Sequence, residues 1–344
     1  MALNLQNFAP MLKTMYTKGK IQNLTFPEST MLMDVPKAED FFGESFTQPL
    51  IYGNPQGRSA VFTTAQANKG NTKSAKFIVT RTRDYGLVSI DNETIEASQN
   101  DAGAFVSARK TEIDGMFREM GATAGIDLIG TGSGVRGQVS ATQTLSASVV
   151  QLANPDDIVK FEVGQAIVAS ATNGGGSVRA GVAYIIARDY KTGQFTVSSS
   201  LGGAATALNT CIAAIAVSDF LFVQGDYDAK LKGYKAWLPY GGASATPFFG
   251  LDRTTDQQRL AGVWDDLSAL SIEEALIEGA KTMKRVGSNI DRVWISDTRM
   301  ADLIKSQGTK VQWVDVGVTP EVGFRGVKLQ TGKVTKEQIG AYLD

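Results

Sequence analysis

The amino-acid sequence predicts an α+β fold in which a long helix and a strand-rich insertion separate an N-terminal β-hairpin from a mixed C-terminal region. Residues 46–90 hold two β-like runs, the residues after Asp91 carry apolar side chains at helical spacing, and residues 138–224 hold several short strand-like runs between glycine turns. With 344 residues, 43% of them apolar, the chain can bury a sizeable core. At roughly 150 residues per domain, it is expected to form two or three domains.

Residues 1–45 predict an extended arm, because short apolar pieces alternate with turn formers and no helical or strand period is sustained. After them, GRSAVFTT and KFIVTRTRDYGLVSI are joined by the polar piece AQANKGNTK, which predicts one long hairpin within residues 46–90. Each face of the return strand carries only one or two large apolar side chains, so neither face resembles a core. Because a two-stranded ribbon is marginal in water, this one either crosses a neighbouring subunit or lies on its own domain.

A long helix is predicted to begin at Asp91 or Asn92, with acidic residues in its first turn, and to end near Gly121. Roughly 30 residues would span about 45 Å at 1.5 Å per residue. The chain is then expected to fray into GATAGIDLIGTGSGVRGQ. The apolar positions at helical spacing, expected to form one buried stripe, are Val106, Ile113, Phe117 and Met120.

Residues 138–224 predict a small β-barrel or sandwich inserted between helical parts, because small and β-branched residues dominate and charges are few. Strand-like runs include IVKFEVGQAIVAS, GVAYIIARDY and GQFTVSSS, and DYKTGQF has the composition of a hairpin turn. Cys211 lies in the apolar run NTCIAAIAV, where a free cysteine behaves as a small buried hydrophobe. One thiol cannot form an internal disulfide, and a reducing compartment is expected.

Residues 225–344 predict a mixed α/β region. Ser271 and Glu274 form a capping box before a helix that Gly287 would end. DRVWIS predicts a short buried strand, DTRMADLIKSQG a second capped helix, and KVQWVDV and GFRGVKLQ two further strands. The inner face of the first helix is expected to consist of Ile272, Leu276, Ala280 and Met283.

Composition excludes several classes of function. The 34 basic and 35 acidic residues leave no positive field to hold nucleic acid, so only weak or local contact with DNA is expected. The chain has no histidine, which excludes Ser-His-Asp, Cys-His and histidine-ligated zinc sites. No apolar run reaches the roughly 18 residues of a membrane helix, and the N-terminus lacks the pattern of a signal peptide. We therefore expect a protein that is made and kept in the cytoplasm, without membrane contact.

Several short motifs resemble ligand-binding or catalytic motifs, but the sequence around them does not support such a site. Gly132–Gly137 spells G-x-G-x-x-G, but it follows the predicted helix instead of a strand, so a flexible linker is favoured over a dinucleotide site. The carboxylate pairs Asp226/Asp228 and Asp265/Asp266 lack EF-hand spacing and are interpreted as solvated loop charges, not as cation or glycosidase sites. No catalytic, cofactor-binding or metal-ligating residue is expected.

Six basic residues make the hairpin locally positive and are the candidate inter-subunit contacts. Ion pairs with acidic patches on adjacent subunits would contribute roughly 0 to 1 kcal/mol per exposed pair. The alternative is that these charges keep the chain soluble and protect an exposed strand edge. The six residues are Arg58, Lys69, Lys73, Lys76, Arg81 and Arg83.

The order of arm, long hairpin, long helix, β insertion and mixed region resembles that of the major capsid proteins of tailed bacteriophages, the Hong-Kong-ninety-seven type fold. Local sequence is similar as well. YGNPQGRSAVFTTAQANK, RDYGLVSIDNETIEAS and DAGAFVSARKTEIDG resemble the extended-loop and spine-helix region. LKGYKAWLP, FFGLDRTTDQQRLAG and SIEEALIEGAKTMKRVGSNIDRVWIS resemble the segment leading into the axial domain. The resemblance covers most of the chain outside the β insertion.

The resemblance implies five parts: an N-terminal arm (1–45), an extended loop (46–90), a spine helix with peripheral domain (91–137), the inserted β domain (138–224), and an axial domain with C-terminal strands (225–344). Family members continue past GFRGVKLQ with further strands of the peripheral domain, whereas this chain ends at TKEQIGAYLD, which implies a shortened form. Some relatives join an extended-loop lysine to an asparagine of another subunit. Lys69 and Lys73 lie in the corresponding region, but no partner can be named and no crosslink is expected.

The resemblance also implies a structural subunit, not an enzyme. Copies would assemble as pentamers and hexamers in the bacterial cytoplasm into the icosahedral head of a virion, which encloses double-stranded DNA through weak contacts. Portal, scaffolding or decoration proteins would be further partners, and no cofactor is expected. Two alternatives stay open. A nanocompartment shell of the same fold, similar to encapsulins, would differ in particle contents, and a carbohydrate-binding or hydrolytic protein would use the β insertion and the paired aspartates.

Overall fold

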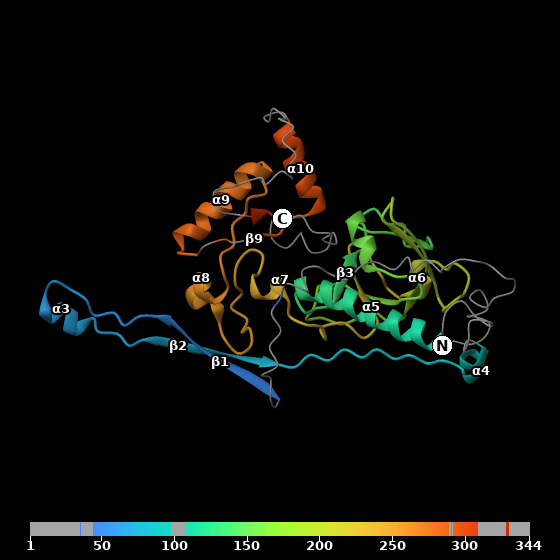
Figure 1. Cartoon of the computed structure of the whole chain (residues 1–344), viewed down its shortest axis with the longest axis horizontal. Coiled ribbons are helices and arrows are strands. Elements are labelled where there is room, and N and C mark those ends of the chain that lie inside the picture. Colours follow the sequence, from blue (N-terminus) through green and yellow to red (C-terminus); the bar gives the residue numbers. More distant parts are fainter. Residues whose placement is uncertain are drawn as a thin grey trace. The chain divides into compact units, whose positions relative to one another are not determined.

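The computed structural model describes residues 35, 44–97, 108–288, 290, 292–308 and 328–329, and its helices and antiparallel sheets confirm the general α+β class (Figure 1). The described chain divides into two compact units. One takes in the described residues from 83 to 126, and the other takes in residue 35, residues 44–82 and the described residues from 127 onward. The expected arm lies outside the described residues, apart from positions 35, 44 and 45.

The predicted helix begins where expected but ends later. Helix α4 spans Asn92–Ala97 and helix α5 spans Ala108–Ile129, and the residues between them lie outside the described chain. The expected fraying after Gly121 is wrong, because the last turn of α5 is buried at Asp127 and Ile129. Tertiary packing of this end outweighs the low helix propensity of the two glycines in GATAGIDLI.

The packing face of α5 also differs from the predicted stripe. Ile113 and Phe117 are 39% and 70% exposed, so the expectation that they are buried is wrong, and Val106 lies outside the described residues. A Cβ atom placed on Gly86 would lie 2.8 Å from the sulfur atoms of both Met116 and Met120. Within this unit, therefore, the extended chain around Gly86 packs on an i, i+4 methionine pair.

The insertion forms a closed six-stranded antiparallel barrel in the order β3-β8-β5-β6-β7-β4. Its outermost strands meet, because Val139 bridges Leu152 and the N–H of Ser140 donates to the carbonyl of Gln151 at 2.9 Å. Of the two expected architectures, the barrel is therefore observed. The elements are β3 (Val135–Gln138), β4 (Val149–Gln151), the 3₁₀ helix η2 (Pro155–Lys160), β5 (Ala166–Ser170), β6 (Ala183–Asp189), β7 (Gln194–Ser198), α6 (Leu208–Cys211) and β8 (Phe220–Val223).

One hydrophobic core fills the barrel and draws all its fully buried residues from the insertion. Phe161 and Phe195 lie at its centre with ring centroids 5.1 Å apart. Cys211 belongs to this core, and burial raises the pKa of its thiol, as expected for a structural cysteine. The first and last strands lie side by side, with Val135 opposite Phe222, so the chain enters and leaves the barrel at neighbouring strands.

The predicted hairpin turn DYKTGQF joins β6 to β7. The carboxylate of Asp189 accepts hydrogen bonds from the hydroxyl of Thr192 at 2.8 Å and from the N–H of Lys191 at 2.9 Å. Gly193 has a φ angle of +67°, a conformation that favours glycine. The hydrogen bond from Thr192, followed by that from Lys191, lowers the pKa of Asp189.

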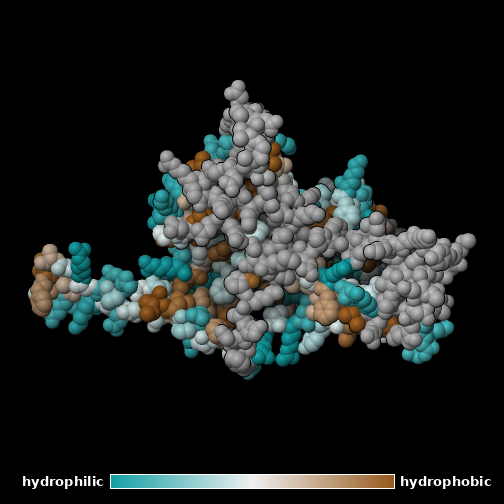
Figure 2. Space-filling view, in the orientation of Figure 1, coloured by the Kyte–Doolittle hydropathy of each residue, from teal (hydrophilic) through white to brown (hydrophobic). Residues whose placement is uncertain are grey.

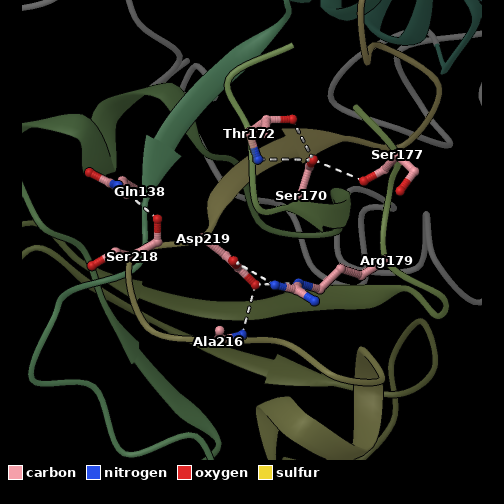
Figure 3. A network of polar contacts seen from close by, with 8 residues as sticks. All are labelled: Gln138, Ser170, Thr172, Ser177, Arg179, Ala216, Ser218 and Asp219. Carbon is pink, nitrogen blue, oxygen red and sulfur yellow. Dashed lines mark hydrogen bonds and ion pairs between the residues drawn. The ribbon is translucent and has the colours of Figure 1, made fainter. Parts of the chain in front are cut away.

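A polar network joins the segments that flank β5 and β8 (Figure 3). The guanidinium of Arg179 donates to both carboxylate oxygens of Asp219, at 2.5 and 2.9 Å. Asp219 is only 3% exposed and also accepts from the N–H of Ala216 at 2.7 Å. The side-chain amide of Gln138 donates to the carbonyl of Ser218 at 2.7 Å. These bonds satisfy the buried carboxylate and fix the chain as it enters β8.

The C-terminal region has the predicted helices. The capping box at Ser271 and Glu274 is present, and Gly287, with φ +87°, follows the end of the first helix. Its inner face packs around Leu276, which forms a small core with Ile295 and Leu303. KVQWVDV lies outside the described residues, and only residues 328–329 of GFRGVKLQ lie within them. The elements are α7 (Tyr234–Trp237), η3 (Arg253–Asp256), α8 (Gln257–Leu260), α9 (Ile272–Arg285), β9 (Arg292–Val293), α10 (Asp297–Gly308) and β10 (Lys328–Leu329), with β9 and β10 parallel.

Candidate functional site

The long hairpin exists, but its strands are not the predicted ones. Strand β1 (Ser45–Gly53) pairs antiparallel with β2 (Lys73–Thr80). The predicted first strand, GRSAVFTT, is instead irregular chain followed by helix α3 (Phe62–Ala67), and the return strand ends ten residues earlier than expected. Pro49 stands within β1, which an edge strand tolerates because the missing N–H is not needed for pairing.

The base of the hairpin is anchored in an aromatic cluster, contrary to the expectation that neither face is buried. Phe77 is 8% exposed, and its ring lies edge-on to Trp237 at 5.3 Å and to Phe248 at 6.4 Å. Next to it, the N–H of Ile78 donates to the carbonyl of Phe249 at 3.0 Å. Side chains and backbone together hold β2 to the C-terminal region.

A buried arginine supports this cluster. The guanidinium of Arg253 lies 3.9 Å from the centre of the Phe248 ring and donates to the carbonyls of Trp237 and Ala236 at 2.8 and 2.9 Å. Burial lowers the pKa of Arg253, whose charge is balanced here by carbonyl dipoles and the ring face. From α8, Arg259 donates to the carbonyl of Tyr52 at 2.5 Å, which attaches β1 as well.

The far end of the hairpin is a closed loop with an exposed apolar tip. The N–H of Gly70 donates to the carbonyl of Gln56, and this bond closes the neck of the loop. Beyond the neck, α3 has no buried residue, and Val61 and Phe62 are 56% and 78% exposed. Figure 2 shows hydrophobic residues at this free end. We call Val61 and Phe62 the apolar tip.

All six predicted contact residues are exposed, but they do not form a single patch. Arg58 and Lys69 lie near the neck of the loop, where a Cβ atom placed on Gly57 would lie 3.0 Å from the Cα atom of Lys69. Lys73 and Lys76 belong to β2 and, being three residues apart, point to opposite faces of the ribbon. Arg81 and Arg83 follow β2, and Arg83 already belongs to the other unit. Within the described chain, no ion pair is formed by Arg58, Lys69, Lys73, Lys76 or Arg83.

The hairpin carries a net positive charge. Residues 44–83 contain these six basic side chains and a single acidic one, Glu44, which amounts to a net charge of +5. Because the whole chain has a net charge of −1, the remaining residues carry −6. The hairpin and the rest of the chain therefore have net charges of opposite sign.

The apolar tip is the feature that sequence analysis missed. The sequence predicts a strand at Val61 and Phe62, because SAVFTT has high β propensity. The available signal was an adjacent pair of large apolar residues inside an otherwise polar stretch that also contains Pro55, Gly57 and Gly70. Such a pair in a turn-rich segment indicates an exposed contact more than a buried strand.

The aspartate pair near residue 226 is not a pair of solvated loop charges, so that expectation is wrong. Asp226 lies 3.3 Å from Lys230 and 3.7 Å from Arg136, and Asp127 at the end of α5 lies 3.6 Å from both cations. We call these four residues the buried charge cluster. Asp228 instead accepts from the N–H of Gly175 at 2.7 Å. Both carboxylates are therefore occupied in structural contacts.

The other short motifs also have structural roles. Gly132 and Gly134, with φ of +90° and +80°, pack against the chain at Lys230 and Asp226, so this segment is a packed turn and not a flexible linker. Asp265 accepts from the hydroxyl of Thr282 at 3.3 Å. Within the described residues, no cluster of three or more histidine, cysteine or acidic side chains could hold a metal ion, and no helix is long and apolar enough to span a membrane.

Comparison of this chain with known protein families, with curated proteins and with solved structures found no match.

Proposed function

We propose that this chain is a structural subunit that assembles with copies of itself into a closed shell, as the major capsid protein of a tailed bacteriophage. The observation that carries the proposal is the hairpin, which is anchored at its base and presents an apolar tip that its own described chain leaves exposed. An element built in this way gains stability when a neighbouring copy covers its end.

The apolar tip supplies the driving force in this proposal. Full burial of a valine or phenylalanine side chain contributes about 1.5–3 kcal/mol each. One such contact is weak once the entropy lost on association is subtracted. In a ring, every subunit gives its hairpin to one neighbour and receives that of another, so many weak contacts act together.

In this proposal, net charge determines which surfaces of two copies approach each other. The hairpin carries +5 and the remaining chain −6, so the favoured approach brings the hairpin of one copy onto the body of another. Arg58 and Lys69 beside the apolar tip would form the polar rim of that contact. Because exposed ion pairs contribute little energy, these residues guide assembly more than they stabilise it.

The test removes the loop while preserving the ribbon. Gly53 and Lys73 are the last paired residues of the hairpin, so residues 54–72 can be replaced by Asn-Gly, a two-residue turn that suits an antiparallel pair. We expect the unaltered chain to form closed particles in negative-stain microscopy and sedimentation, and the shortened chain to stay soluble and folded without forming them.

Two results would count against the proposal. One is an unaltered chain that stays a compact monomer over the whole accessible concentration range. The other is a shortened chain that assembles normally. Particle contents distinguish the two kinds of shell, since a phage head encloses DNA and a nanocompartment encloses protein cargo.

A further inference from the structure

The loop after β5 contains the one position in the sequence where glycine directly follows asparagine, Asn173–Gly174. Asn173 is exposed, and Gly174 has a φ angle of +97°. The loop runs from Thr172 to Ser177, and Ser170 holds both of its ends. As Figure 3 shows, the Ser170 hydroxyl donates to the carbonyl of Ser177 at 2.9 Å and accepts from the N–H of Thr172 at 3.3 Å.

Two side chains from the segment after β8 fix the middle of this loop. The N–H of Gly175 donates to the carboxylate of Asp228 at 2.7 Å, and the N–H of Gly176 donates to the hydroxyl of Tyr227 at 2.8 Å. A Cβ atom on Gly174 would lie 2.6 Å from the other Asp228 oxygen, so the carboxylate lies directly against the backbone there. The loop is thus held in one conformation.

The side chain of Asn173 has a specific partner. Ser133, which is 6% exposed, donates its hydroxyl proton to the side-chain carbonyl oxygen Oδ1 of Asn173 at 2.6 Å. The hydroxyl of Thr131 lies 2.9 Å from that of Ser133. Since the Ser133 proton points to Asn173, the Thr131 hydroxyl is the donor in this second bond, which leaves Ser133 a stronger donor.

We propose that Asn173–Gly174 is a self-modification site, at which the main-chain nitrogen of Gly174 displaces the side-chain amide of Asn173. A bond forms between that nitrogen and Cγ of Asn173, and negative charge develops on Oδ1, where the Ser133 hydroxyl stabilises it. The Cγ–Nδ2 bond then breaks, the proton of the attacking nitrogen goes to the departing nitrogen, and ammonia leaves. The absence of a side chain on Gly174 leaves its nitrogen open to this attack.

The product is a five-membered succinimide, which water opens. Addition of water at one ring carbonyl returns the normal backbone with aspartate at position 173, and addition at the other gives isoaspartate, with one extra methylene in the backbone. Overall, asparagine and water are converted to aspartate or isoaspartate and ammonia, and no oxidant or reductant is needed.

The modification would release the loop. A new carboxylate at position 173 would be adjacent in the chain to Gly174, against which the Asp228 carboxylate lies, and like charges at short distance repel each other. In the isoaspartate form, the added methylene also shifts Gly175 and Gly176 away from Asp228 and Tyr227. The loop would thus change from a fixed to an open state on the time scale of the chemistry, without an enzyme.

The test follows the peptide of residues 161–179, which trypsin releases between Lys160 and Arg179 and which contains no asparagine other than Asn173. The folded chain is incubated at mildly alkaline pH, and the conversion of amide to acid is measured by mass spectrometry, with chromatography to separate aspartate from isoaspartate. The folded chain should convert about fivefold faster than the same chain unfolded in urea, the effect of one net hydrogen bond of roughly 1 kcal/mol. An equal or lower rate in the folded chain would overturn the proposal without any variant.

Three substitutions identify the residues responsible. Ser133→Ala should lower the rate about fivefold, and Ser133→Thr, which keeps a hydroxyl, should retain it. Asn173→Gln should abolish the conversion in this peptide, since the larger ring that glutamine requires closes slowly. An unchanged or higher rate in Ser133→Ala would show that the hydroxyl does not promote the reaction. Hydrogen exchange at Gly175 and Gly176 should accelerate as product accumulates, and unchanged exchange would refute release of the loop.

Discussion

Phe77 and Phe62 lie at the two ends of one hairpin, one buried and one exposed. Substitution of each by alanine therefore tests the two ends separately. Phe77 at the base is 8% exposed and contacts Trp237 and Phe248, whereas Phe62 in the apolar tip is 78% exposed. We expect Phe77→Ala to loosen the hairpin within a single copy. We expect Phe62→Ala to leave the single copy intact and to impair only contacts between copies.

The free-energy cost of each substitution follows from how deeply the phenylalanine side chain is buried. Truncation of a buried phenylalanine costs about 3–5 kcal/mol, and we expect the lower end for Phe77 because its side chain keeps 8% of its surface exposed. About 3 kcal/mol corresponds to a local opening equilibrium that is roughly a hundredfold more favourable. For Phe62, a surface change should alter the free energy of unfolding by about 0.5 kcal/mol or less.

Hydrogen exchange measured by mass spectrometry separates the two outcomes. In Phe77→Ala, the amides of β2 (Lys73–Thr80) should exchange roughly a hundredfold faster, while those of the barrel core stay protected. In Phe62→Ala, exchange should be unchanged and particle formation reduced. Unchanged exchange in β2 after Phe77→Ala would refute the anchoring role of the cluster, and normal particles from Phe62→Ala would refute the role of the apolar tip.

Two further predictions concern single charges. Asp226→Asn removes one of the two carboxylates of the buried charge cluster, so the free energy of unfolding should fall by about 3 kcal/mol, and an unchanged value would mean that the Asp226 carboxylate does not stabilise the cluster. The turn at Asp189 should respond to pH, because hydrogen bonds from Thr192 and Lys191 lower its pKa. A lowered pKa stabilises the turn above the ordinary carboxyl value, and this stabilisation is lost as pH falls through the lowered folded-state value. Titration of Asp189 by NMR should therefore show a higher pKa in Thr192→Val, and an equal value would contradict this assignment.

Several features followed directly from the sequence, because their signals lie within a few residues of the structure they specify. The capping box at Ser271 and Glu274 needs only four consecutive residues, and both its hydrogen bonds are present. The turn between β6 and β7 depends on Asp189 and Gly193, which are four residues apart. The strand-rich insertion was visible from the composition of residues 138–224, and its first strand begins three residues earlier, at Val135.

Other features depended on residues far apart in the chain. The burial of Phe77 depends on Trp237 and Phe248, which no local pattern connects to β2. The strand propensity of SAVFTT favoured β structure, but this stretch lies in a loop closed between Gln56 and Gly70, where helix α3 begins at Phe62. The role of Asp226 depends on Arg136, which lies ninety residues earlier.

The sequence by itself determined the capping box at Ser271, the turn at Gly193 and the strand-rich insertion, and it contains no histidine. Only the tertiary structure decided which apolar side chains are buried and which stay exposed, as with Phe77 and Phe62. The physical reason is the separation along the chain between the residues that form each contact. Caps and turns are hydrogen bonds between near neighbours in the chain, whereas burial depends on which distant segments fold against one another.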